Sequence, residues 1–158
     1  MLPPPVTSPF TIRVLSWDAA RSLARPLREA VFVHEQGVPI EQEWDELDSC
    51  SDHAIALTPA GEAIGTARLL PETGSAGVFR IGRMAVLKPW RGCGVGAALL
   101  NALLERADGR GARSIVLHAQ THASGFYQRF GFTAEGGEYL EAGIPHFTMR
   151  RELLNPPA

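Results

Sequence analysis

The sequence carries one glycine-rich segment that could bind an anion, placed between a predicted strand and a predicted helix. The segment consists of Arg91, Gly92, Cys93, Gly94, Val95 and Gly96. Glycines let the backbone turn tightly and bring its N–H groups close to a ligand. The first turn of the following helix adds unpaired N–H donors and the positive end of the helix dipole. We therefore predict an anion site built from backbone amides, to which Arg91 adds a positive charge.

Two common phosphate-binding motifs do not fit this segment. A Walker A loop ends in Gly-Lys-Ser/Thr, and no such tripeptide follows here. A dinucleotide fingerprint places G-x-G-x-x-G after the first strand of its fold, whereas Gly92, Gly94 and Gly96 alternate and come after earlier strands. A thiol hydrolase that uses a Cys93–His118 pair is an alternative, although no third group to orient the histidine is evident.

A second block of the sequence makes the first more specific. Tyr127-Gln128-Arg129-Phe130-Gly131-Phe132 closes a short predicted helix. With the 91–96 segment, it resembles the two signature blocks of the GNAT superfamily of N-acetyltransferases, over roughly residues 10–152. Further pieces resemble the ElaA-like branch of that family: residues 28–36 (REAVFVHEQ), the acids Glu43, Asp45 and Asp48 ahead of His53, and residues 143–146 (GIPH).

The resemblance implies that acetyl-CoA is the co-substrate and that an amine attacks it directly in a ternary complex. The CoA pyrophosphate would lie on the amides of residues 91–96, and pantetheine would lie between splayed strands against the backbone of Met84, Ala85 and Val86. A strand-edge N–H such as that of Val86 could stabilise the oxyanion. Tyr127 would stand near the thioester sulfur, where a phenol can protonate the leaving thiolate. Gln120 stands where the family often has Asn, and its amide can still bond pantetheine.

Tyr127 also has a purely structural interpretation. It lies beside Phe126 and Phe130, and a buried tyrosine can simply pack while its hydroxyl bonds a backbone carbonyl. A non-enzymatic module of the same fold, which binds CoA or another anion as a sensor or scaffold, would not need this hydroxyl. The glycine-rich segment favours the catalytic interpretation. His53, His118 and His146 are interpreted as structural, and no spacing of His, Cys and acids indicates a metal site.

Charge is distributed unevenly along the chain. Residues 34–53 contain seven acids and no Lys or Arg, whereas residues 80–113 contain seven bases and two acids. An acidic surface attracts cations, so we predict a cationic amine acceptor, small molecule or protein, contacted by Glu35, Glu43 and Asp45. The alternative is that these acids only solvate a loop. The net charge of −2 gives no electrostatic case for nucleic-acid binding.

Length and composition favour one folded domain. The 158 residues are 45% hydrophobic, and a chain of this size can form its own core. We expect one acetyltransferase domain over residues 10–152 between irregular tails at residues 1–9 and 153–158. No apolar run approaches the ~20 residues of a membrane span, and the N-terminus does not resemble a signal peptide. Two cysteines make no disulfide scaffold, so we expect a cytoplasmic protein with no membrane partner, and a homodimer is left open.

The elements that must position these residues follow from the apolar pattern. Strands are predicted at residues 10–15, 53–58, 62–70, 78–87, 114–119, 132–135 and 146–152. Helices are predicted at residues 19–24 after Asp18, 27–35 after Pro26, 95–109 and 123–130, with an acidic loop at residues 37–51. This order predicts an α/β (α+β) fold. With the resemblance, we expect a GNAT-like mixed, largely antiparallel sheet of six to seven strands, flanked by helices on both faces.

Overall fold

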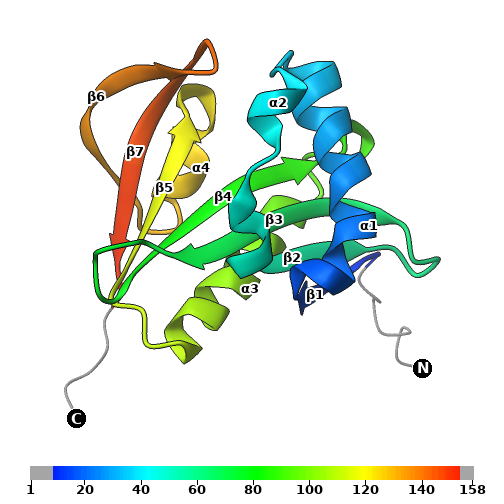
Figure 1. Cartoon of the computed structure of the whole chain (residues 1–158), viewed down its shortest axis with the longest axis horizontal. Helices are drawn as coiled ribbons and strands as arrows, with labels where there is room; N and C mark the ends of the chain where they lie inside the picture. The colour runs from blue at the N-terminus through cyan, green and yellow to red at the C-terminus, as the bar shows by residue number, and fades with distance from the viewer. Residues whose placement is uncertain (1–8, 154–158) are drawn as a thin grey trace, which may run out of the picture.

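The computed structural model describes residues 9–153 and contains one mixed sheet of seven strands in the order β1-β2-β3-β4-β5-β7-β6 (Figure 1). The strands are β1 (Thr11–Leu15), β2 (Asp52–Leu57), β3 (Ala63–Pro71), β4 (Val78–Val86), β5 (Ser114–Gln120), β6 (Thr133–Glu141) and β7 (Ile144–Glu152). Neighbouring strands are antiparallel except for the parallel pair β4–β5. The predicted fold class is therefore confirmed.

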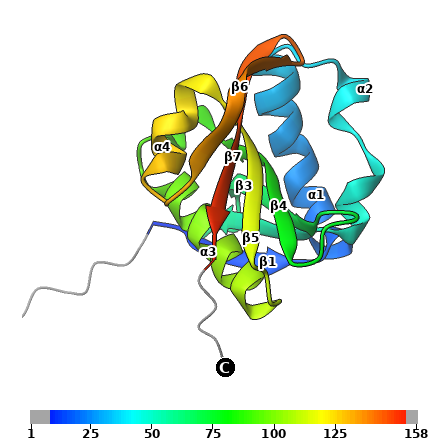
Figure 2. The ribbon, with the colours of Figure 1, turned by 90° about the vertical axis from the view of Figure 1, so that its left-hand side faces the viewer.

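Helices cover both faces of this sheet, as Figure 2 shows. The α-helices are α1 (Trp17–Arg28), α2 (Ile40–Glu43), α3 (Val95–Gly109) and α4 (Ser124–Gln128). A π-helical segment, η1 (Glu29–Glu35), continues α1, and short 3₁₀ turns cover Glu46–Cys50, Lys88–Trp90 and Thr121–Ala123. Helices α1 and α2 lie on one face, and α3 and α4 lie on the other. Among residues 9–153, no helix has the length and apolar character needed to cross a membrane.

The core explains why these elements form. Helix α3 repeats leucine with a helical period, so that Leu99, Leu100 and Leu103 are fully buried against the sheet. On the opposite face, Ala20 and Ala24 of α1 pack against Ile55 of β2. Burying one leucine side chain contributes roughly 1.5–3 kcal/mol. The two helices therefore hold the sheet from both sides and fix the position of the strand ends.

The strands β4 and β5 pair over a short distance and then separate. Residues 78–81 of β4 pair with residues 114–117 of β5, and both strands continue beyond that point (Figure 1). A bulge accompanies the separation, because Thr66 of β3 opposes Ala85 while Arg68 opposes Gly82. Arg83 lies in this bulge with a positive φ of 52°. A bulge bends its strand and increases the local twist, so the edge of β4 turns away from β5.

Several local predictions were wrong at element boundaries. The first helix does not stop before Pro26 but continues through it to Arg28, and it begins at Trp17 after Ser16 rather than after Asp18. Proline removes one helical donor, yet Leu27 and Arg28 next to it are almost completely buried, and this packing holds the helix together. The predicted acidic loop contains α2 and a 3₁₀ turn. Strand β6 is longer than predicted and extends to Glu141.

The helix of residues 95–109 and the hairpin of β2 and β3 are where the sequence pattern predicts them. The predicted tails lie mostly outside the described residues. Leu153, predicted as tail, packs against the core, and its N–H donates to the carbonyl of Arg113 at 2.7 Å.

Candidate active site

A cleft of about 580 Å³ opens where β4 and β5 separate. Its walls come from five parts of the fold: residues 81–86 of β4; Leu117, His118 and Gln120 of β5; Val31 and Phe32 of η1; Phe126 and Tyr127 of α4; and residues at the β6–β7 turn. The cleft is therefore bounded on one side by η1 and on the other by α4. It contains the predicted residues Met84, Ala85, Val86, Arg91 and Tyr127 together.

The edge of β4 that faces this cleft has no strand partner beyond Ile81, and the carbonyl of Val86 there accepts from Nε of Arg91. Ala85 and Val86 pair with β3 on their other side, and β5 pairs with β4 only as far as Ile81. A strand edge without a partner presents N–H and C=O groups to a ligand. An extended amide-bearing ligand can lie along such an edge in the manner of an added strand.

The glycine-rich turn lies at the start of α3. Gly92 and Gly94 have φ values of 78° and 84°, and Gly94 is the residue from which the helix starts. A positive φ favours glycine because it has no Cβ. Residues 91–94 are exposed, and a Cβ at Gly96 would lie 3.6 Å from the Phe126 ring. The helix N-terminus is thus open to solvent beside α4, which suits an anionic group.

The side chain of Arg91 is used differently from the prediction. Its two terminal nitrogens donate to Glu35 at 2.9 and 2.7 Å, and its Nε donates to the carbonyl of Val86 at 2.9 Å. The hydrogen bonds from Arg91 lower the pKa of Glu35. Arg91 therefore ties the end of η1 to the end of β4, and its charge is balanced by one of the predicted acceptor residues.

Tyr127 has features of both interpretations. Its ring packs edge-on against Phe126 and Phe132 in the core. Its hydroxyl reaches the cleft, where it donates to the Sδ of Met84 at 3.6 Å. A thioether is a weak acceptor, so a ligand atom could replace it at little cost. Burial raises the pKa of Tyr127 to about 12, which keeps the phenol protonated and able to donate.

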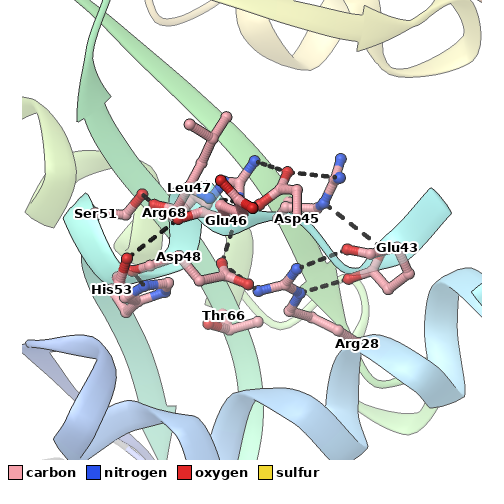
Figure 3. Close-up of polar contacts among 12 residues, drawn as sticks. Arg28, Glu43, Asp45, Glu46, Leu47, Asp48, Ser51, His53, Thr66 and Arg68 are labelled. Carbon is pink, nitrogen blue, oxygen red and sulfur yellow. Dashed lines mark hydrogen bonds and ion pairs between the residues drawn. The ribbon is translucent and has the colours of Figure 1, made fainter. Parts of the chain in front are cut away.

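Glu43 is placed in a buried ion cluster rather than free in the cleft (Figure 3). Arg28 donates from Nε to Glu43 at 2.5 Å and from Nη1 to Asp48 at 2.8 Å. The side chains of Arg28 and Glu43 are only 1% and 3% exposed. Burial raises the pKa of Glu43, against the opposing effect of Arg28. Although Glu43 borders the cleft, its Oε1 is already bonded to Arg28.

Asp45 belongs to the other half of the same cluster. Arg68 donates to both oxygens of Asp45 at 2.8 Å and to Asp48 at 2.9 Å (Figure 3). Arg83 also reaches Asp45, at 3.2 Å. Burial alone would raise the pKa of Asp45, but the hydrogen bonds and charge of Arg68 lower it to about 2. The cluster thus balances three acids with three arginines, and much of the acidic charge seen in the sequence is neutralised internally.

The histidines differ in their surroundings. His53 is buried, stacks near Trp17 and contacts the carbonyl of Asp48 at 2.9 Å, in a structural position. His118 and His146 both line the cleft, and both contact Glu141. Neither Glu141 nor this contact of His118 was predicted from the sequence. The alternation of β5 could have indicated it, since His118 is two residues from Gln120 and therefore on the same face.

Two other predicted groups have defined partners. Gln120 donates from its side-chain amide to Gln36 at 2.9 Å, so it joins β5 to the segment that follows η1. Cys93 is exposed and its thiol contacts the carbonyl of Arg91, whereas His118 contacts Glu141, so Cys93 and His118 are not paired in this structure. Across residues 9–153, no group of three or more His, Cys, Asp and Glu is arranged to hold a metal ion.

Comparisons with known proteins agree with this geometry. A family model described as an acetyltransferase (GNAT) domain matches residues 20–153. The uncharacterized N-acetyltransferase YjcF of Bacillus subtilis is 39% identical over 127 residues, which cover 80% of this chain and 88% of YjcF. The crystal structure of Escherichia coli ElaA superposes with a TM-score of 0.82 at 31% identity, over 90% of this chain and 99% of ElaA. The crystal structure of an acyl-CoA N-acyltransferase from Pseudomonas aeruginosa superposes with a TM-score of 0.76 at 34% identity, over 90% of this chain and 97% of that protein.

Proposed function

The chain belongs to the GNAT acetyltransferase family, in its ElaA-like branch, and from that premise we propose that it transfers an acetyl group from acetyl-CoA to a free amine by direct attack in a ternary complex. The observation that carries this proposal is the cleft between β4 and β5. It combines a strand edge that has no strand partner with a protonated phenol, and Arg91, which precedes the N-terminus of α3, also lines it. Two free cysteines, Cys50 and Cys93, are in keeping with a reaction in the reducing cytoplasm.

In this proposal, each predicted donor-side group has one task. The amides of residues 91–96 bind the pyrophosphate, and the β4 edge at Met84, Ala85 and Val86 binds pantetheine. The neutral amine attacks the thioester carbonyl, and the N–H of Val86 stabilises the oxyanion. When the intermediate collapses, the C–S bond breaks and Tyr127 protonates the leaving thiolate. The products are the amide and free CoA.

Release of free thiol from acetyl-CoA in the presence of a panel of amines tests the reaction. Thiol release that depends on an amine supports transfer. CoA binding by calorimetry without any thiol release would favour the sensor or scaffold alternative. Thiol release without an amine that is lost on alkylation of Cys93 would favour the hydrolase alternative.

Substitution at the glycine-rich turn should weaken CoA binding. Gly94→Val should raise the Kd for CoA about tenfold or more, because it adds bulk where the backbone must approach the ligand, and about tenfold corresponds to ~1.4 kcal/mol. Cys93→Ala should stay within about twofold, because the amide and not the thiol is used. Calorimetry measures both.

The control for this prediction separates backbone strain from binding. Gly74 has a φ of 81°, close to the 84° of Gly94, and an added Cβ would meet nothing within 4 Å at either position. Gly74→Val therefore carries a similar conformational cost in the β3–β4 loop. If Gly94→Val binds CoA like the wild type, or if Gly74→Val weakens binding equally, the turn is not the pyrophosphate site.

We further propose that the acceptor amine is cationic, supported by the acids of residues 34–53 beside the cleft. Glu43 and Asp45 are paired with arginines inside the buried cluster, whereas the pair of Glu35 with Arg91 is exposed, with 38% of the Glu35 side chain open to solvent. Glu35→Gln should therefore raise KM for a diamine about threefold, more than Glu43→Gln or Asp45→Asn do, and the wild-type rate should fall with added salt.

Glu41→Gln is the matched control for this prediction, because Glu41 is an exposed acid of the same stretch on α2. Steady-state kinetics with a diamine and with an amino acid of similar length compare the two charge types. A preference for the amino acid, with Glu35→Gln indistinguishable from Glu41→Gln, would show that the acidic stretch does not select the acceptor.

A further inference from the structure

A histidine, a carboxylate and a second histidine form a polar group on the cleft wall opposite Tyr127. Nδ1 of His118 lies 3.1 Å from Oε1 of Glu141, and Nε2 of His146 lies 3.4 Å from Oε2 of the same carboxylate. All three residues line the cleft. His118 comes from β5, whereas Glu141 ends β6 and His146 belongs to β7, so the group depends on the fold and not on a sequence motif.

His118 faces the side of the sheet that is covered by α1 and η1. Its neighbours Leu117 and Ala119 belong to the core that includes α3. Successive side chains of a strand point to opposite faces, so His118 and Gln120 point toward η1. The bond between Gln120 and Gln36, which follows η1, agrees with this direction. Tyr127 comes from α4 on the other face (Figure 2), so the two groups approach the cleft from opposite sides.

The hydrogen bonds decide which nitrogen of His118 is free. An ionised carboxylate only accepts hydrogen bonds, so Glu141 assigns the proton of neutral His118 to Nδ1 and leaves a lone pair on Nε2. This is the arrangement in which a carboxylate orients an imidazole as a base. Tyr139 packs edge-on against His118 at 6.0 Å and stacks on His146 at 6.1 Å, which limits the rotation of both rings.

His146 fixes Glu141 from the other side. Its Nδ1 lies 2.6 Å from the carbonyl of Ile144, so Nδ1 must carry a proton. Its Nε2 lies on the opposite side of the ring, 3.4 Å from Oε2 of Glu141. The His146 side chain is only 8% exposed, whereas that of His118 is 35% exposed. His146 is thus placed to hold the carboxylate, and His118 is placed to reach a substrate.

We propose that His118 is the base that removes the proton from the acceptor ammonium, with Glu141 as its positioning residue; this rests on the proposed N-acetyl transfer. Nε2 of His118 takes one proton from R–NH₃⁺ and passes it to solvent. The resulting R–NH₂ forms the C–N bond, and the C–S bond breaks when the tetrahedral intermediate collapses. The thiolate takes the proton of Tyr127, and the second nitrogen proton returns to the phenol, directly or through water. One proton is released for each amide formed.

Kinetics of His118→Ala and His118→Gln test the assignment, with His34→Ala as a control at an exposed histidine of η1. We expect kcat for an alkyl amine to fall about 10²-fold in both His118 variants, with an unchanged Kd for acetyl-CoA. Added imidazole should restore part of the rate to His118→Ala. With hydroxylamine, which is already uncharged at neutral pH, the loss should be much smaller. Glu141→Gln should lower kcat about tenfold, and Glu141→Asp should recover part of it.

The outcomes separate this proposal from the one on which it rests. If the wild type releases no thiol with any amine, acetyl transfer itself fails. If the wild type is active and both His118 variants keep its kcat, His118 is not the base. If kcat falls equally for the alkyl amine and for hydroxylamine and imidazole restores nothing, His118 only supports the cleft, and the assignment is overturned.

Discussion

Tyr127→Phe should lower kcat by about 10²–10⁴-fold, with a Kd for acetyl-CoA within about twofold of the wild type. In the proposed reaction, the phenol acts on the leaving thiolate, so its effect belongs to the transition state and not to binding of the donor. Stopped-flow or steady-state thiol release gives kcat, and calorimetry gives the Kd. The substitution removes one oxygen and keeps the ring, which preserves the packing against Phe126 and Phe132.

Thermal unfolding is the control for this variant. The hydroxyl of Tyr127 donates only to a thioether, a weak acceptor, so the melting temperature should change by no more than about 4 °C, or ~1 kcal/mol. A variant with full kcat and normal stability would show that the hydroxyl of Tyr127 is not catalytic and that the residue only packs in the core. A variant that melts far below the wild type would show that the hydroxyl is structural.

The raised pKa of Tyr127 also sets the pH range over which it can act. With a pKa of about 12, the phenol stays protonated at every pH at which the enzyme is assayed. Its folded pKa lies above the usual value of 10.0, so the unfolded chain loses this proton first. The contribution of this group to stability is complete below about pH 10 and is lost as the pH rises toward 12.

Arg28→Met should lower the free energy of unfolding by about 3–5 kcal/mol, the cost of leaving a buried carboxylate without its partner. The side chain of Arg28 is 1% exposed, and its removal deprives the buried Glu43 of its hydrogen-bonded arginine, whereas Asp48 keeps Arg68. For a domain of this size, the melting temperature should fall by about 10 °C. Denaturant and thermal unfolding measure the change.

Arg106→Met is the matched control because it breaks an ion pair on the surface. Arg106 is 52% exposed and contacts Asp52 at 3.2 Å, and such pairs contribute about 0–1 kcal/mol. Equal losses of unfolding free energy in the two variants would show that the buried cluster contributes no more to stability than a surface ion pair does. In the wild type, the arginines hold the pKa of Asp45 at about 2, below its usual value of 3.8. The stability that this shift contributes is fully present above about pH 3.8 and is lost as the pH falls toward 2.

The elements that the sequence predicts well are those whose signals are local. Helix α3 starts at the glycine-rich turn and buries leucines at a helical period, so its bounds follow from residues 95–109 alone. The same applies to the β2–β3 hairpin, which has a turn signal between two apolar runs. Pro26 is the opposite case. Its local signal breaks a helix, but the burial of Leu27 and Arg28 outweighs it.

The parts of the site that sequence reasoning did not anticipate depend on distant partners. Seven acids in one stretch indicate a charged surface, but three of them are neutralised by arginines from three other elements. Glu43, Asp45 and Asp48 pair with Arg28, Arg68 and Arg83. His118 is a similar case, because its partner Glu141 lies on a strand separated from β5 by β7. Such contacts set the charge and basicity of a side chain. They join residues that are far apart in the sequence, so no local sequence pattern predicts them.

The short pairing of β4 with β5 also divides the sheet mechanically. Strands β1 to β4 form one block and strands β5 to β7 form the other, joined by residues 78–81 and 114–117, by the core beneath α3 and by the Gln36–Gln120 bond. Such blocks can open separately, at a free energy below that of global unfolding. A donor that lies in the cleft and forms hydrogen bonds with both walls would link β4 to β5 where the two strands do not pair. Binding would then couple the two blocks into one cooperative unit, so that occupancy of the site and rigidity of the fold rise together.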